Sequence, residues 1–192
     1  MNAIANLSAL PLPAKTLVVV GMPGAGKSSI GKRLATRLGR SFVDSDAEVE
    51  AAAGMKIMRI FEQLGETAFR DGERRVIARL LERPPHVLAT GGGAFMDDET
   101  RALIHEHALS IWLRADFDIL LERTSRNNNR PLLHQGDRAQ VLRDLMARRE
   151  PIYAQADIVV DTSNNPPDET AERVMKALHD YAASNNPGRE DA

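Results

Sequence analysis

The 192-residue chain contains no cysteine, and this absence excludes several kinds of chemistry together. Disulfides, zinc–thiolate sites, iron–sulfur clusters and thiol nucleophiles all need cysteine sulfur. The lack of cysteine also fits a reducing compartment. The first fifteen residues lack a basic start followed by a long apolar core, so no secretory signal is predicted and a cytoplasmic location is expected.

An excess of either charge is missing as well. Lysine and arginine total 25 against 27 aspartate and glutamate residues, a formal net charge of −2. A nearly neutral chain has no overall field that would attract nucleic acid or an anionic membrane, so neither is expected as a partner. Long apolar runs are absent too, because the longest, near 17–20, has the length of a strand and not of a membrane span. With 43% hydrophobic residues, the composition is that of an ordinary globular domain.

The pattern of apolar residues predicts one domain over 16–183, between a loose lead-in (1–15) and a polar tail (184–192). Short apolar runs alternate with stretches of helical periodicity. One such stretch has its apolar stripe at Ile57, Ile60, Phe61 and Leu64, followed by Val76, Ile77, Leu80 and Leu81. The runs that predict strands are 16–20, 41–43, 86–90, 109–113 and 158–160. Such alternation predicts an α/β fold with a parallel sheet and helices on both faces. Ligands of these sheets bind beyond the carboxyl ends of the strands.

A glycine-rich segment follows the first predicted strand. Residues 21–28 read GMPGAGKS and match the pattern G-x-x-x-x-G-K-[ST], with a strand before and a helix after. Its backbone N–H groups and the helix N-terminus can hold phosphates, Lys27 can bridge the β- and γ-phosphates, and the Ser28 hydroxyl can bind Mg²⁺. The alternative is a chance glycine turn. We predict ATP binding by consecutive residues: Gly24, Ala25, Gly26, Lys27, Ser28 and Ser29.

Two aspartates, Asp44 and Asp46, follow the second predicted strand. Their spacing puts both side chains on the same side of an extended strand. One carboxylate can hold Mg²⁺ through water, and the other can accept the proton of a substrate hydroxyl. The alternative is a helix cap, because aspartate favours helix starts and a helix follows.

A glycine triplet and several arginines complete the candidate site. Gly91, Gly92 and Gly93 follow the third predicted strand, and they indicate either a plain turn or a close approach of backbone to a ligand. Arg70 has Glu73 three residues later on a helix, where the carboxylate can orient the guanidinium. A guanidinium grips a carboxylate or phosphate with paired hydrogen bonds, although any single arginine is more often a surface residue.

Together these motifs resemble the shikimate kinase family, a group of small P-loop kinases. The matching segments appear in the family's order: GMPGAGKS at 21–28, FVDSD at 42–46, Gly65-Glu66 with Phe69-Arg70 and Glu73, GGGA at 91–94, NRPLL at 129–133, and Arg149 with Pro151 and Tyr153. The resemblance implies a P-loop NTPase fold, with a five-stranded parallel sheet of order 2-3-1-4-5 and a mobile lid at about 125–137. It also implies transfer of the ATP γ-phosphoryl group to the 3-hydroxyl of shikimate, in aromatic amino-acid biosynthesis.

The resemblance assigns roles on the acceptor side of the site. Asp46 would contact the reacting hydroxyl as the base. Arg70 and Arg149 would clamp the shikimate carboxylate. The backbone at Gly92 would hold a ring hydroxyl, with Gly91 and Gly93 beside it.

The resemblance also assigns roles on the nucleotide side, where one Mg²⁺ per subunit accompanies ATP. Ser28 and, through water, Asp44 would support the metal. Arg130 would reach the phosphates from the lid and would be catalytic together with Lys27 and Asp46. Arg123 would lie near adenine. By the resemblance, the loop at 163–167 would also contact adenine, although it lacks an arginine that the family often has there.

Two other functions stay open at this point. One is another small P-loop kinase, such as a gluconate-type kinase, which the Asp-x-Asp pair and the paired arginines disfavour. The other is a nucleotide-binding module without catalysis, which would not need a substrate clamp. A monomer is expected, because no long apolar face is left over.

Overall fold

The computed structural model describes residues 14–125, 137–162 and 166–185. Several predicted features therefore lie outside the described residues. These are most of the lead-in, nearly all of the lid with Arg130, residues 163–165 of the expected adenine loop and most of the tail.

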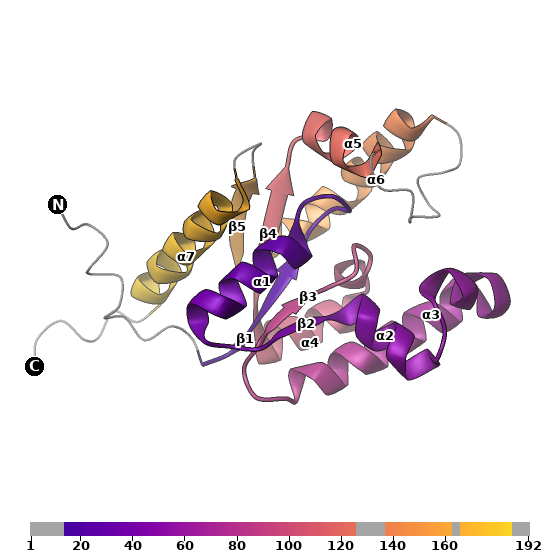
Figure 1. The fold of residues 1–192 in the computed structure, drawn as a ribbon, viewed down its shortest axis with the longest axis horizontal. Helices are drawn as coiled ribbons and strands as arrows, with labels where there is room; N and C mark the ends of the chain where they lie inside the picture. Colours follow the sequence, from indigo (N-terminus) through magenta and orange to yellow (C-terminus); the bar gives the residue numbers. More distant parts are fainter. Residues whose placement is uncertain (1–13, 126–136, 163–165, 186–192) are drawn as a thin grey trace, which may run out of the picture.

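Five parallel strands form one sheet in the order β2-β3-β1-β4-β5, which confirms the implied topology (Figure 1). The strands are β1 (Thr16–Val20), β2 (Phe42–Asp44), β3 (Val87–Ala89), β4 (Ala108–Ala115) and β5 (Ile158–Thr162). The central strand β1 is buried over its whole length, as its β-branched run predicts. Val19 is in register with Ala89 of β3 and with Ile111 of β4, so these strands end at one edge of the sheet.

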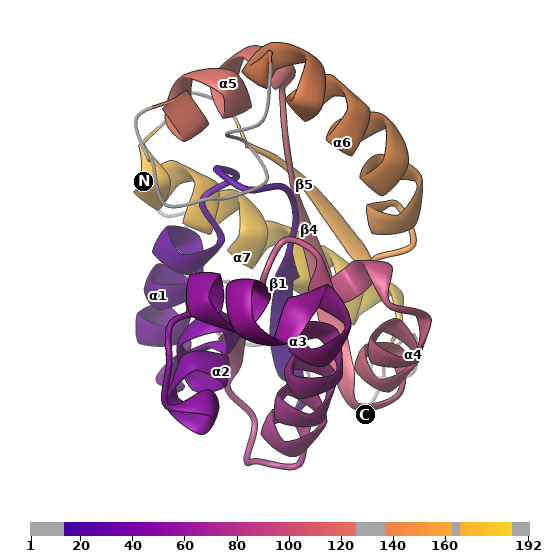
Figure 2. The same ribbon diagram turned by 90° about the vertical axis from the view of Figure 1, so that its right-hand side faces the viewer.

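Helices cover both faces of the sheet. They are α1 (Lys27–Leu38), α2 (Ser45–Ala53), α3 (Ile57–Leu81), α4 (Asp98–His107), α5 (Phe117–Ser125), α6 (Arg138–Tyr153) and α7 (Pro167–Ser184), with a short 3-10 helix η1 (Ala94–Met96). Helices α1 and α7 pack together on one face, and α3 and α4 pack together on the other (Figures 1 and 2). Within the described residues, no helix combines the length and the apolarity that crossing a bilayer requires.

One continuous core joins the sheet to both helical layers. Its fully buried side chains come from β1, β3, β4 and most helices; among the largest are Leu17, Leu34, Ile77, Leu80, Leu88, Ile104, Ile111, Leu113, Leu120 and Leu142. Trp112 of β4 belongs to this core with 5% of its surface exposed. The residues at the carboxyl edge of the sheet are therefore carried by a packed framework.

Two predictions of local structure are wrong. The second strand ends at Asp44, and Asp46 lies in the first turn of α2. Strand alternation therefore does not explain why the two aspartates are neighbours. Leu64, predicted to share the apolar stripe of its helix, is 58% exposed. The reason is Gly65, whose φ of 81° interrupts the helical path of α3 at that turn.

Candidate active site

The glycine-rich segment forms a tight loop between β1 and α1. Gly21 and Gly26 have φ angles of 141° and 94°, which side-chain-bearing residues rarely adopt. A Cβ on Gly21 would also lie 2.7 Å from the carbonyl oxygen of Leu113. Lys27 opens α1, and its Nζ donates hydrogen bonds to the carbonyls of Gly21 at 2.9 Å and Met22 at 3.0 Å. The loop therefore sets an ammonium group and a helix N-terminus at one point, as phosphate binding requires.

Ser28 and Asp44 meet beside this loop. The Ser28 hydroxyl donates a hydrogen bond of 2.8 Å to Oδ2 of Asp44. The other carboxylate oxygen, Oδ1, accepts from the backbone N–H of Asp46 at 3.0 Å and so caps α2. Asp44 therefore caps α2, as the alternative interpretation predicted, and it also contacts the serine of the phosphate loop, while its role toward Mg²⁺ stays a prediction.

The Ser28–Asp44 pair offers hard oxygen donors, the kind that Mg²⁺ prefers. Among the described residues, no group of three or more histidine, aspartate or glutamate side chains forms a metal cage. This donor set fits Mg²⁺, which is commonly held by one or two protein oxygens together with substrate phosphates and water.

The glycine triplet lies directly after β3 and gathers the side chains of the acceptor side. A Cβ on Gly91 would lie 2.6 Å from Oδ1 of Asp46, and a Cβ on Gly93 would lie 2.5 Å from Nη2 of Arg70. Nη1 of Arg149 would be 3.3 Å from a Cβ on Gly92. Asp46, Arg70 and Arg149 therefore all approach the same turn, as expected from the sequence. They can come this close because the three glycines of the turn have no side chains.

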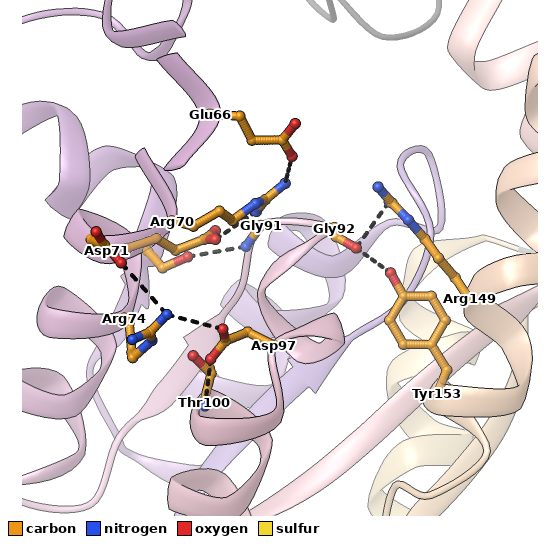
Figure 3. A network of polar contacts seen from close by, with 12 residues as sticks. Glu66, Arg70, Asp71, Arg74, Gly91, Gly92, Asp97, Thr100, Arg149 and Tyr153 are labelled. Carbon is orange, nitrogen blue, oxygen red and sulfur yellow. Dashed lines mark hydrogen bonds and ion pairs between the residues drawn. The ribbon is translucent and has the colours of Figure 1, made fainter. Parts of the chain in front are cut away.

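Arg70 extends from the part of α3 that follows the Gly65 kink. Its Nη1 donates to Oε2 of Glu73 at 2.6 Å, as the spacing of three residues predicts, and its Nη2 lies 3.4 Å from Oε1 of Glu66. The guanidinium also lies over the Phe69 ring, 5.0 Å from its centroid. These contacts fix the direction in which Arg70 faces the glycine turn (Figure 3).

Glu73 is a buried carboxyl group beside the site. Its side chain is only 4% exposed, and its Oε1 has no hydrogen-bond partner among the described residues. Burial raises the pKa of Glu73 above its ordinary value, and the charges of Asp46 and Asp97 raise it further, while Arg70 acts in the opposite direction. The carboxyl group therefore gives up its proton less readily in the folded protein than in the unfolded chain.

Arg149 and Tyr153 reach the turn from α6, on the side opposite Arg70 (Figure 3). Nη1 of Arg149 donates to the Gly92 carbonyl at 3.0 Å, and the Tyr153 hydroxyl donates to the same oxygen. The turn is therefore held between α3 and α6, with one arginine on each side.

Arg123 lies on the nucleotide side. Its Nη1 is 3.4 Å from the carbonyl oxygen of Gly24, so the structure places it against the phosphate loop. Arg130, the remaining predicted phosphate ligand, lies outside the described residues.

No role for Ser45 is predicted from the sequence. This serine is fully buried, and its hydroxyl oxygen accepts a 3.0 Å hydrogen bond from the N–H of Gly91, which ties α2 to the glycine turn. Its position between Asp44 and Asp46 is a signal that could have drawn attention to it.

A phosphate loop, an adjacent serine–aspartate pair, and a carboxylate and two arginines that approach one glycine turn are the features of a P-loop phosphotransferase that acts on a small acceptor. A family model described as "Shikimate kinase" matches residues 23–179. A shikimate kinase of Caulobacter vibrioides is 58% identical over 168 residues, which are 88% of this chain and 84% of the relative. One from Paramagnetospirillum magneticum is 56% identical over 167 residues, 87% of this chain and 86% of the relative.

A solved structure of similar fold is a shikimate kinase from Acinetobacter baumannii in complex with shikimate. It superimposes with a TM-score of 0.84 at 36% identity and covers 91% of this chain and 96% of its own. The chain belongs to the shikimate kinase family. It is an ATP-using kinase that phosphorylates shikimate, a transferase of aromatic amino-acid biosynthesis.

Proposed function

We propose that the chain transfers the γ-phosphoryl group of ATP to the 3-hydroxyl of shikimate. The observation that carries this proposal is the glycine turn, where Asp46, Arg70 and Arg149 converge next to the phosphate loop. The acceptor oxygen forms a bond to the γ-phosphorus, the bond from that phosphorus to the ADP oxygen breaks, and the hydroxyl proton leaves to a base. Shikimate 3-phosphate and ADP are the products.

Asp46 is the proposed base. Its Oδ1 faces the backbone of Gly91, and the α2 cap at Asp44 fixes the first helical turn that carries it. A positioned carboxylate of this kind contributes about 10²–10⁴-fold to the rate of proton transfer.

Arg70 and Arg149 are the proposed clamp for the shikimate carboxylate. They approach the turn from opposite helices, and a guanidinium recognises a carboxylate through two parallel N–H donors. Binding the carboxylate between them would orient the ring so that one hydroxyl faces Asp46.

Residues of the phosphate loop are the proposed ATP site. Lys27 would turn from the loop carbonyls to the phosphates, and Ser28 with Asp44, the latter through water, would hold Mg²⁺. The metal supplies neutralisation of phosphate charge when bound. Arg123 is the proposed neighbour of adenine, and Arg130 stays a prediction as a ligand of the transferring phosphate. A monomeric state and a cytoplasmic location also stay predictions.

An ADP-release assay tests the acceptor. With MgATP, shikimate, gluconate and nucleoside monophosphates are compared at equal concentration, and the phosphorylated carbon is assigned by phosphorus–proton correlation NMR. The proposal expects ADP only with shikimate and phosphate on the 3-oxygen. Turnover with gluconate instead would favour a gluconate-type kinase. Tight ATP binding with no ADP formed would favour a non-catalytic module.

A further inference from the structure

The carbonyl oxygen of Gly92 is shared by two donors from one helix. Arg149 donates from Nη1 at 3.0 Å, and Tyr153 donates from its hydroxyl. The two residues stand four apart on α6 and so face the same side. A carbonyl oxygen has two lone pairs, and both donors aim at it, so the position of that oxygen is tied to both side chains (Figure 3).

Tyr153 is the more firmly anchored of the two donors. Only 1% of it is exposed, and its ring stacks against Trp112 of β4 at 5.9 Å and Phe95 of η1 at 6.4 Å between centroids. Aromatic contacts of this kind fix a ring within the packed core. The hydroxyl therefore has a fixed position, whereas Arg149 ends a long side chain with several rotatable bonds.

Gly92 also touches the phosphate loop. A Cβ on Gly92 would meet Cδ of Pro23 at 3.2 Å, so the turn packs between Pro23 on one side and the two α6 side chains on the other. Tyr153 therefore binds the residue of the glycine turn, Gly92, that contacts both the phosphate loop and Arg149.

We propose that Tyr153 is a positioning residue for the acceptor site. Its hydroxyl holds the Gly92 carbonyl in place, and the held carbonyl orients the Arg149 guanidinium toward the shikimate carboxylate. This rests on the proposed function, in which Arg149 binds that carboxylate. In this proposal Tyr153 influences shikimate binding through Arg149 and the turn.

Steady-state kinetics of Tyr153→Phe test the proposal, with Tyr181→Phe on α7 as the matched control. Phenylalanine keeps the ring in its stack and removes only the hydroxyl. One lost hydrogen bond corresponds to a rise of about two- to tenfold in the KM for shikimate. The KM for ATP should change much less, and Tyr181→Phe should leave both values unchanged. A Tyr153→Phe enzyme with an unchanged shikimate KM would overturn the proposal.

A double-mutant cycle with Arg149→Ala separates positioning from a general structural role. If Tyr153 acts through Arg149, then Tyr153→Phe should raise the shikimate KM clearly less in the Arg149→Ala background than in the wild type. If Tyr153→Phe raised the shikimate KM by the same factor in the wild type and in the Arg149→Ala background, the proposal would be overturned. A shikimate KM that Arg149→Ala leaves unchanged would overturn both this inference and the proposed clamp.

Fluorescence shows whether the variant keeps its core. The chain has one tryptophan, Trp112, which stacks directly on Tyr153. Trp112 emission that is unchanged in Tyr153→Phe would show that the core is intact. Shikimate titrations followed by the same emission give the dissociation constant for shikimate independently of turnover. Weakened binding with normal emission supports positioning, and weakened binding that only accompanies a general loss of structure overturns it.

Discussion

At the scale of single residues, two carboxylates of similar chemistry stand in very different surroundings. Both carboxylate oxygens of Asp44 accept hydrogen bonds, one from the Ser28 hydroxyl and the other from the backbone N–H of Asp46 at the start of α2. Asp46, two residues on, directs an oxygen at the glycine turn. The structure thus separates a carboxylate engaged by Ser28 and the α2 cap from one that faces the glycine turn.

Replacing Asp46 by asparagine should therefore lower kcat by about 10²–10⁴-fold, because asparagine cannot take the hydroxyl proton. The thermal unfolding midpoint should stay close to that of the wild type. Asp44→Asn is the comparison, since asparagine still caps a helix but weakens support for the metal. That variant should need more Mg²⁺ for half-maximal rate. Near-normal kcat at saturating substrates in Asp46→Asn would contradict the assignment of the base.

Glu73 gives a prediction about pH. Its pKa is raised in the folded protein above the ordinary value of 4.5, mainly by burial, so the folded state binds this proton more tightly than the unfolded chain. Its contribution to the free energy of unfolding is full below pH 4.5 and is lost as pH rises through the raised pKa. Glu73→Gln cannot titrate, so its stability relative to the wild type should increase over that interval.

Urea unfolding of both proteins at a series of pH values measures this difference. Glu66→Gln is the control, because Glu66 also contacts Arg70 but its side chain is 62% exposed. The control should follow the wild-type pH profile. A wild type that instead gains stability over Glu73→Gln with rising pH would mean that the ion pair with Arg70 outweighs burial.

Residue types and short spacings were sufficient to predict the phosphate loop and the pairing of Arg70 with Glu73. Asp44 and Asp46 were singled out from their place after a strand, but the strand spacing used to bring them together was wrong, and the role of Arg149 came only from the family resemblance. Contacts such as the hydrogen bond from Gly91 to Ser45 could not be predicted, because they join residues 46 positions apart whose approach is decided by chain packing.

At the scale of elements, the long helix α3 shows where periodicity fails. Apolar spacing predicts helical structure on both sides of Gly65, and the structure has it. The break itself is a backbone event at φ 81° and ψ 172°, a region that is essentially restricted to glycine. A glycine in a sequence is compatible with many conformations, so its presence alone did not predict this kink.

Gly65→Ala should consequently lower the free energy of unfolding by about 1–3 kcal/mol, or else straighten α3 and displace Arg70. Gly54→Ala is the comparison, because Gly54 sits at φ 65° in the left-handed region after α2 and a Cβ there would also meet nothing within 4 Å. Gly54→Ala should lower the free energy of unfolding less than Gly65→Ala does, by about 1 kcal/mol. Urea titrations give both values, and the shikimate KM reports on Arg70. A Gly65→Ala enzyme with wild-type stability and KM would show that the kink is not required.

At the scale of the whole molecule, patterning predicted a parallel sheet flanked by helices and a site at its carboxyl edge. The order of the strands was predicted only from the family resemblance. An apolar run indicates that a strand is buried, but it does not indicate which strands lie beside it. That order places β1 beside β3, and so brings the phosphate loop after β1 against the glycine turn after β3. The phosphate loop and the glycine turn, which are far apart in the sequence, are therefore in contact at Pro23 and Gly92.

Thermal unfolding with ligands should distinguish the proposed nucleotide site from the proposed acceptor site. A ligand at 100 times its dissociation constant stabilises the folded state by about 2.7 kcal/mol. Lys27→Met should lose most of the rise in midpoint caused by MgADP and keep the rise caused by shikimate. Arg149→Ala should show the reverse, because its guanidinium lies on the acceptor side of Gly92 while Lys27 lies in the phosphate loop. The wild type should respond to both ligands. If each substitution abolished both responses equally, the loop and the turn would have to act as a single site, and the separate assignment of Lys27 and Arg149 would fail.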